Sequence, residues 1–157
     1  MLFGQNPTAF AARLVVRRFD LRTRQVSSLP GSDGLWFAQW SPSGRYISAL
    51  TGDSKLMLFD LAKNKWTQLT EVTANYPAWS YDSSYIYFDN YPAKESNISR
   101  VRIGDGRLEN VASLKGVRRA QSFESPTPWM GLSPHDSPLV LRDIGSQEIY
   151  ALRVEFP

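Results

Sequence analysis

A motif that starts with tryptophan recurs in this chain, and this repeat constrains the fold more strongly than any other feature. Trp40-Ser41-Pro42-Ser43-Gly44 precedes a short apolar stretch, and Trp79-Ser80 precedes a similar one 39 residues later (40 to 79). Phe19-Asp20-Leu21 recurs as Phe59-Asp60-Leu61 with an offset of 40 (19 to 59). Self-similarity with a period of about 40 residues indicates an architecture of stacked repeats.

A third copy of the motif is weaker. It keeps Ser133-Pro134 and the strand-like stretch that follows, but Leu132 replaces the tryptophan and Asp136 replaces the glycine. The interval from Trp79 to Leu132 is 53 residues (79 to 132), which is longer than the interval between the first two copies. An insertion is therefore expected within 115–128.

Each copy predicts short strands and no helix. Apolar residues alternate between turns, as at Leu56 and Leu58, which is the period of a half-buried strand. Clusters of Gly, Pro, Asn and Asp separate these stretches and favour turns. The expected strands span 35–41, 45–51, 55–61 and 65–70, then 76–80, 84–89, 97–103 and 107–113, and finally 128–133, 138–143 and 147–154.

Four short strands that repeat about every 40 residues are the signature of a β-propeller blade, which hides its faces against neighbouring blades. We therefore predict an all-β protein, a partial β-propeller of about three to three and a half four-stranded antiparallel blades. The motif tryptophan is expected on the innermost strand, wedged against the neighbouring blade. The predicted division is a leader over 1–12, half a blade over 13–33, blades over 34–72 and 73–114, and a C-terminal blade with the insertion over 115–157.

The motif resembles the TolB-like, WD-like β-propeller repeat family, whose hallmark is Trp-Ser-Pro-Asp-Gly before an apolar strand. The first copy has Ser43 in place of the aspartate, and the second keeps Trp79, Ser80 and Asp82 without the proline and glycine. Over about residues 13–157 the chain also resembles the C-terminal propeller half of acidobacterial winged-helix regulators and Ser/Thr kinase-type proteins. That resemblance implies a sensory or scaffold module, because the sequence lacks the motifs of either effector domain.

The expected strands make up about three to three and a half blades, whereas a closed propeller typically needs at least four. We therefore predict an open fan, a row of blades that does not close into a ring. An unclosed fan exposes a sheet face and sheet edges, which favours association. A second copy could complete the ring, a longer chain could complete it, or the N-terminal strands could fold back onto the last blade. We expect self-association or dependence on further sequence.

The residues offer little for catalysis or metal binding. The chain has no cysteine, which excludes disulfides and thiolate metal sites. Its single histidine, His135, is expected in an exposed turn, because no G-x-S-x-G elbow supplies a serine nucleophile. The aspartates occur in turns without the spacing of a calcium loop. We expect no catalytic residue, no metal and no cofactor.

Charge and hydropathy restrict the classes of partner that we expect for this chain. The net charge is only +3, and the cluster Arg17, Arg18, Arg22 and Arg24 is interpreted as a solvated face, so no nucleic acid is expected. No apolar run approaches the roughly 20 residues that span a bilayer. The first residues match the pattern of a signal peptide poorly, so none is expected in this sequence. The resemblance implies an extracytoplasmic location if the parent protein is a TolB-like sensor and a cytoplasmic one otherwise.

Loops that join the outer strand of one blade to the inner strand of the next are the expected binding surface. They lie near 30–36, 71–76 and 115–128, and their aromatic and arginine side chains suit a protein or peptide partner. Packing between blades is the alternative role for each tryptophan. The candidate ligand-binding residues are Trp36, Tyr76, Arg118, Arg119, Phe123 and Trp129.

These observations predict a non-catalytic β-propeller module that binds a protein or peptide or assembles with itself. One alternative is the substrate-gating propeller of a peptidase-like hydrolase whose catalytic domain is absent from this chain. Another is a truncated gene product without an independent role.

Overall fold

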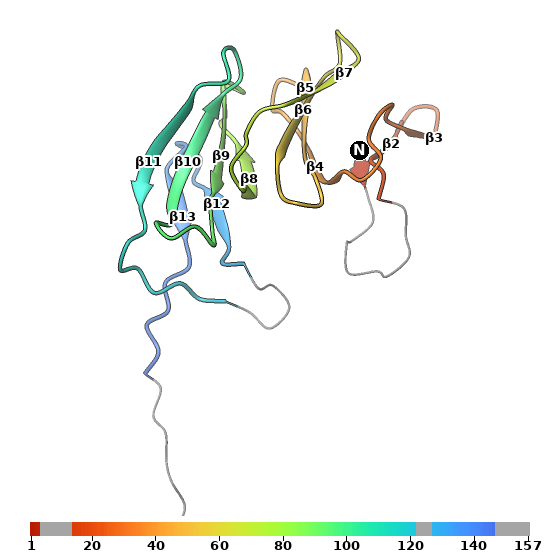
Figure 1. Ribbon diagram of the computed structural model, residues 1–157. Helices are drawn as coiled ribbons and strands as arrows, with labels where there is room; N and C mark the ends of the chain where they lie inside the picture. Colours follow the sequence, from red (N-terminus) through yellow and green to blue (C-terminus); the bar gives the residue numbers. More distant parts are fainter. Residues whose placement is uncertain (4–13, 122–126, 147–157) are drawn as a thin grey trace, which may run out of the picture.

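The computed structural model describes residues 1–3, 14–121 and 127–146, and these form strands joined by turns and loops (Figure 1). The first sheet consists of β1 (Leu2–Phe3), β2 (Arg17–Phe19) and β3 (Val26–Ser28). The second consists, in order, of β4 (Trp36–Trp40), β5 (Tyr46–Leu50), β6 (Leu56–Asp60) and β7 (Lys65–Gln68). The third consists of β8 (Asn75–Trp79), β9 (Tyr85–Asp89), β10 (Asn97–Arg102) and β11 (Leu108–Ser113). The fourth consists of β12 (Met130–Leu132) and β13 (Pro138–Val140).

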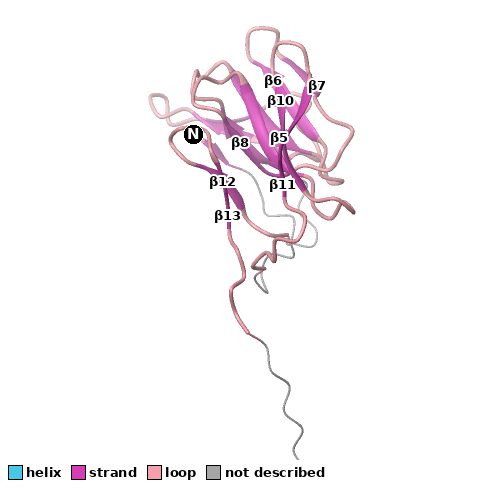
Figure 2. Ribbon diagram, turned by 90° about the vertical axis from the view of Figure 1, so that its left-hand side faces the viewer, coloured by secondary structure: helices cyan, strands magenta, loops and turns pink. Residues whose placement is uncertain are grey.

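The prediction of an all-β chain is confirmed for the described residues, among which Figure 2 shows strands and loops only. The observed strands of the second and third sheets differ from the expected ranges by no more than two residues at either end. No helix that could cross a membrane occurs in the described part of the chain. The strand expected over 147–154 lies outside the described residues.

The N-terminal residues differ from the expected leader. Leu2–Phe3 pair with β2, and the Met1 ammonium group donates a hydrogen bond to the Phe19 carbonyl at 3.0 Å. This short strand gives partners to backbone groups at an edge of β2 that would otherwise be unpaired. Residues 4–12 of the expected leader lie outside the described part of the chain.

An apolar cluster fills each junction between successive sheets. At the first junction Val16 and Leu29, which flank β2 and β3, pack with Leu35, Ile47, Ala49 and Phe59. The second cluster joins Leu50, Leu56 and Leu58 to Ala74, Ile86, Phe88 and Val101, and the third consists of Tyr87, Ile98, Leu114 and Met130. Figure 1 shows the resulting row of sheets, from β2 and β3 on the right to β8–β11 on the left. Burial of one such side chain stabilises the fold by about 1.5–3 kcal/mol.

The motif residues occupy equivalent places at the three junctions, as predicted. Trp40 packs against the first cluster, Trp79 against the second and Leu132 against the third. Trp79 stacks on the Tyr46 ring with a centroid distance of 6.3 Å, and its Nε1 donates to the Ser48 Oγ at 3.0 Å. Each motif residue therefore wedges its own sheet against the preceding one.

The turns after the motif residues are also linked to one another. Gly44, Ser83 and Asp136 occupy the same turn position, and all three have left-handed backbones with φ of 70°, 63° and 59°. The Ser83 Oγ accepts a hydrogen bond from the Ser43 N–H at 2.9 Å, and the Asp136 Oδ1 accepts one from the Tyr81 N–H at 2.9 Å. Side chains in place of the hallmark glycine thus join each turn to the turn of the preceding copy.

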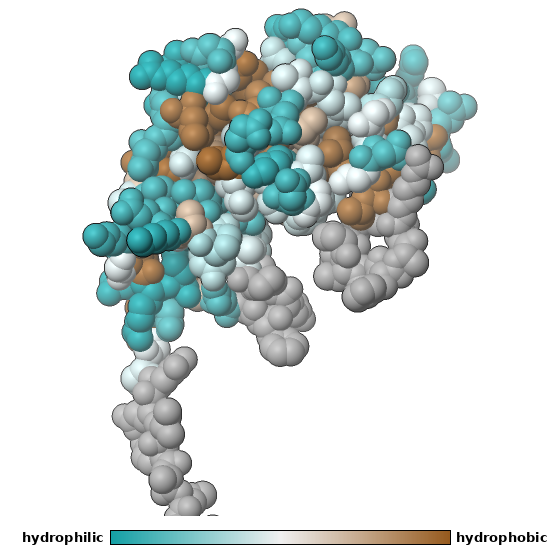
Figure 3. Space-filling model, viewed as in Figure 1, coloured by the Kyte–Doolittle hydropathy of each residue, from teal (hydrophilic) through white to brown (hydrophobic). Residues whose placement is uncertain are grey.

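The first sheet lies on the right in Figure 1, whereas β12 and β13 lie beside the third sheet on the left, which they overlap in this view. The residues that flank β2 and β3 pack with the second sheet, whereas β12 and β13 pack with the third. The N-terminal strands therefore do not fold back onto the last sheet, which was one of the three expected arrangements. In the space-filling view apolar residues form separate patches bordered by hydrophilic ones (Figure 3).

Candidate functional site

Trp36 lies at the start of β4 and is half-buried. Its Nε1 donates a hydrogen bond to the Thr51 carbonyl at 2.9 Å, and its ring packs against the second apolar cluster. Because the polar edge of the indole already has a partner and its apolar face is packed, Trp36 supports the sheet junction. The neighbouring Phe37, which the sequence analysis did not select, is 37% exposed.

Phe37 and Tyr76 sit at equivalent bulges of the two inner strands. The register of β4 shifts between Trp36 and Gln39, and that of β8 shifts between Asn75 and Ala78. Both residues have left-handed backbones, with φ of 52° at Phe37 and 47° at Tyr76. The two rings meet edge to face with centroids 6.2 Å apart. A bulge redirects a side chain, and a left-handed conformation is uncommon for a bulky residue.

Trp129 occupies the same place in the third copy, three residues before Leu132. It is 40% exposed, and its ring covers Gly131 so closely that a Cβ there would lie 2.7 Å from the indole. Gly131 is opposite Leu139 in the fourth sheet. The name inner-strand aromatic row is used here for the three residues at this position of the copies, Phe37, Tyr76 and Trp129, of which the first two have rings in contact.

Arg119 is buried, unlike its neighbour Arg118. Its side chain is 8% exposed and forms an ion pair at 2.5 Å with the carboxylate of Asp89, which is fully buried. Its guanidinium also donates to the Trp129 carbonyl at 3.0 Å. Arg119 therefore joins the end of β9, the inserted loop and the start of β12, and its charge is already neutralised. Asp89 also has the turn role expected of the aspartates, because its Oδ1 accepts a hydrogen bond from the Tyr91 N–H at 2.9 Å.

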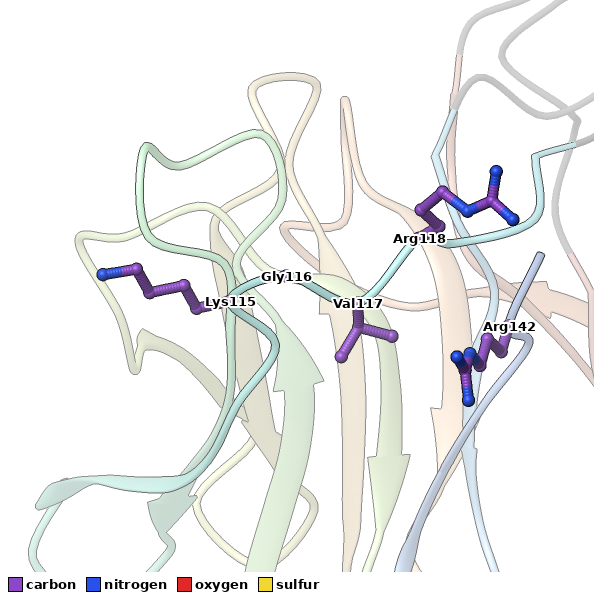
Figure 4. Close-up of a pocket in the computed structure, with 5 residues that line it drawn as sticks. All are labelled: Lys115, Gly116, Val117, Arg118 and Arg142. Atoms are coloured by element: carbon purple, nitrogen blue, oxygen red, sulfur yellow. The ribbon is translucent and has the colours of Figure 1, made fainter. Parts of the chain in front are cut away.

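Arg118 lines an open hollow of about 450 Å³ together with Lys115, Gly116, Val117 and Arg142 (Figure 4). In this view Arg118 and Arg142 extend on one side of Val117, and Lys115 extends on the other. The segment begins with a turn in which the Val117 N–H donates to the Leu114 carbonyl at 3.0 Å. Gly116, the third residue of this turn, has φ of 76°. A positive φ at the third residue is typical of a type II turn.

Two other groups of polar residues are less suited to a site. Arg100 and Arg102 both pair with Glu109 at 2.8 and 3.0 Å, and hydrogen bonding by Arg100 holds the pKa of Glu109 below its ordinary value. This cluster is occupied by its own ion pairs. His135 is exposed in a turn, where its backbone N–H donates to the Ser133 Oγ at 3.3 Å. Within the described ranges no group of three or more His, Cys, Asp and Glu side chains could hold a metal ion.

The structure thus divides the candidate residues. Tyr76 and Trp129 belong to the aromatic row, and Tyr76 also packs against the third apolar cluster. Trp36 and Arg119 support packing, and Arg118 lines the hollow. Phe123 lies outside the described residues. Phe37 could have been found from its place three residues before Trp40, which Tyr76 and Trp129 share in their copies. Lys115 is adjacent to the selected arginines, but no sequence signal indicates Arg142.

No protein-family model matches the chain, and no curated protein matches it. Among solved structures, TolB from Acinetobacter baumannii superposes with a TM-score of 0.60 at 16% identity, over 86% of this chain and 34% of TolB. Oligogalacturonate lyase from Vibrio parahaemolyticus gives a TM-score of 0.57 at 16% identity, over 72% of this chain and 36% of the lyase.

A prolyl endopeptidase structure is similar with a TM-score of 0.53 at 14% identity, over 83% of this chain and 23% of that protein. This chain accordingly spans about a third of the length of TolB and less of the peptidase. Identities this low show that the fold is shared. They do not show a shared activity, because propellers with unrelated activities have the same architecture. The chain is a partial β-propeller with a TolB-like fold.

Proposed function

We propose that this chain is a non-catalytic β-propeller module, the sensory or scaffold part of a larger protein, that binds a protein or peptide through its inner-strand aromatic row. The observation that carries this proposal is the left-handed backbone of Phe37 and Tyr76 at equivalent bulges. Such a conformation costs on the order of 1–3 kcal/mol for each residue, and strain of this kind clusters at binding sites. Its occurrence in both copies supports a functional role for the two rings.

The chemistry of the row suits a polypeptide partner. Aromatic rings offer a large contact area at a small cost in side-chain entropy and are enriched among residues that dominate binding energy. Phe37 and Trp129, at the two ends of the row, are 37% and 40% exposed. Both therefore have ring surface available for contact.

Selection from a phage-displayed library of short random peptides tests this proposal. Peptides enriched on the wild-type chain should bind a Phe37→Gly/Trp129→Ala variant at least about tenfold more weakly, because truncating central aromatic contacts removes binding energy. A Tyr81→Ala variant is the matched control, since Tyr81 is 81% exposed and lies outside the row. Equal binding of the enriched peptides to all three proteins would refute a role for the row.

Self-association is a second candidate function, favoured by the outward face of the fourth sheet. Leu139, opposite Gly131 in this sheet, is 45% exposed, and Leu141, just after β13, is 52% exposed. In the third sheet the corresponding face is covered, since Tyr87 packs against Met130 in the third cluster. Within the described part of the chain Leu139 and Leu141 belong to none of the three apolar clusters. Exposed apolar side chains on a sheet favour association with another sheet.

Light scattering coupled to size-exclusion chromatography measures this association. The wild-type chain should elute as a dimer or larger species, and Leu139→Glu/Leu141→Glu should be monomeric, because charges on the face oppose its burial. A folded wild-type monomer at high concentration would argue against self-association.

The alternative role as the gating propeller of a hydrolase draws its support from the fold likeness to a prolyl endopeptidase. We infer that the chain itself hydrolyses nothing, since its single histidine is in an exposed turn. Fluorogenic ester and peptide substrates should stay intact with the purified chain. Turnover that persists after repurification and disappears in His135→Ala would overturn the non-catalytic assignment.

A further inference from the structure

The described lining of the hollow, residues 115–118 and Arg142, contains three cationic side chains and no acidic one. Arg118 and Arg142 are both exposed at its lining, and Lys115 adds a third cation. The Arg118 guanidinium donates to the neutral Gly145 carbonyl at 3.0 Å. Among residues 1–3, 14–121 and 127–146, no ion pair joins Arg118, Arg142 or Lys115 to an acid. Cations that line one hollow repel each other unless an anion lies among them.

The backbone around these cations is held in place on both sides. Residue 119 forms an antiparallel bridge with residue 142, and the Asp143 N–H donates to the Arg118 carbonyl at 2.9 Å. The buried pair of Arg119 and Asp89 anchors the same segment to the third sheet. Arg118 and Arg142 therefore project from a fixed ladder, which lowers the entropy cost of binding a ligand.

The hollow is also connected to the aromatic row. Arg119 follows Arg118 directly and donates to the Trp129 carbonyl, so one hydrogen bond separates the cationic segment from the end of the row. Guanidinium groups bind carboxylates with paired, charge-assisted hydrogen bonds.

We propose that Arg118 and Arg142, with Lys115 at the rim, bind side-chain carboxylates of an acidic peptide segment whose apolar residues contact the inner-strand aromatic row. This inference rests on the proposed function, because it specifies the class of peptide that the module binds. Nucleic acid is a poorer match, since its phosphates call for a basic stripe rather than one hollow. Binding through exposed cations should weaken as salt is added.

Nuclear magnetic resonance of the isotope-labelled full chain tests the hollow without the natural partner. The probe is acetyl-Glu-Glu-Glu-amide, which has no large apolar side chain and so reports on the hollow alone. Saturable shifts should appear at the Arg118 and Arg142 Nε–Hε signals and along the backbone of 115–118. Acetyl-Gln-Gln-Gln-amide should produce no such shifts, because its side chains carry no charge.

Matched charge-removal variants complete the experiment. Arg118→Gln/Arg142→Gln should weaken binding of the glutamate peptide at least about tenfold, the loss expected for charge-assisted pairs. Arg22→Gln/Arg24→Gln removes the same charge from the connection between β2 and β3 and should leave binding unchanged. Equal weakening in both variants, or equal shifts at all arginines, would overturn the proposal as general charge attraction. Saturable binding of oligothymidylate at the hollow without binding of the glutamate peptide would overturn it in favour of nucleic acid.

Different results would refute peptide binding by the aromatic row and carboxylate binding at the hollow. A Phe37→Gly/Trp129→Ala variant should retain the glutamate peptide while it loses the library-selected peptides. Loss of glutamate-peptide binding in the wild type, with the selected peptides still dependent on the aromatic row, would refute the carboxylate site alone.

Discussion

Phe37 combines two properties that usually exclude each other, a large side chain and a left-handed backbone. Glycine is the residue that adopts this conformation without a steric cost. Tyr76 repeats the combination 39 residues later (37 to 76), so the bulge is a regular part of the repeat. An aromatic ring therefore occurs at both positions although the backbone conformation there is unfavourable for a large side chain.

Replacing Phe37 with glycine separates these two properties. Phe37→Gly should keep the free energy of unfolding within about 1 kcal/mol of wild type, because relief of backbone strain offsets the lost edge-to-face contacts. Phe37→Ala keeps the strain and loses the ring, so it should be less stable than Phe37→Gly. Urea unfolding followed by tryptophan fluorescence measures the difference; a more stable alanine variant would contradict the strain assignment.

Some of these residue roles could be predicted from sequence and others could not. Trp40 and Trp79 were assigned to the wedge between sheets because the motif repeats, and the structure confirms this. Phe37 was missed because a bulge depends on strand register, which no local pattern specifies. Arg118 and Arg119 look equivalent in sequence, and only the position of the distant Asp89 makes one buried and the other exposed.

The loop between β11 and β12 acts as a connector between sheets as well as a lining for the hollow. Leu114 packs in the third cluster, and its N–H donates to the Ser96 carbonyl at 2.9 Å. Arg119 then pairs with Asp89 at the end of β9. Sequence predicted an insertion here from the longer interval between motif copies, but the way in which it is anchored requires spatial contacts.

The Arg119–Asp89 pair should dominate the stability of this loop. Arg119→Ala and Asp89→Ala should each lower the free energy of unfolding by about 3 kcal/mol, because each leaves a buried charge unpaired. The double variant should lose less than the sum of the two, since neither charge then remains. Arg118→Ala is the control and should change stability by less than about 0.5 kcal/mol. Additive losses in urea unfolding would contradict direct coupling of the two side chains.

The stability of the whole molecule depends mainly on the junctions between neighbouring sheets. The second and third sheets are covered on both faces, whereas the first and the fourth contribute to one junction each among the described residues. In such quasi-linear architectures each repeat depends on its nearest neighbours. The repeat in the sequence predicted the order of the sheets. Which sheets are covered on one face only depends on contacts between residues far apart in the sequence, and the repeat does not predict these contacts.

Hydrogen exchange measured by mass spectrometry should reveal this gradient. Amides of β5, β6, β9 and β10 should exchange slowest and those of β2, β3, β12 and β13 fastest, because terminal sheets open with less loss of burial. Trp79→Ala should speed exchange in both the second and third sheets, since the indole contacts both. Uniform exchange across all four sheets would indicate a single cooperative core instead.

The hydrogen bonds that join the turns at Ser83 and Asp136 run from a backbone donor to a side-chain acceptor. The Ser83 Oγ and the Asp136 Oδ1 each accept from a backbone N–H of the preceding copy, that of Ser43 and that of Tyr81. Every residue except proline has a backbone N–H. A serine or an aspartate at this turn position can therefore join its copy to the one before it, whichever side chain the preceding copy has at the donor position.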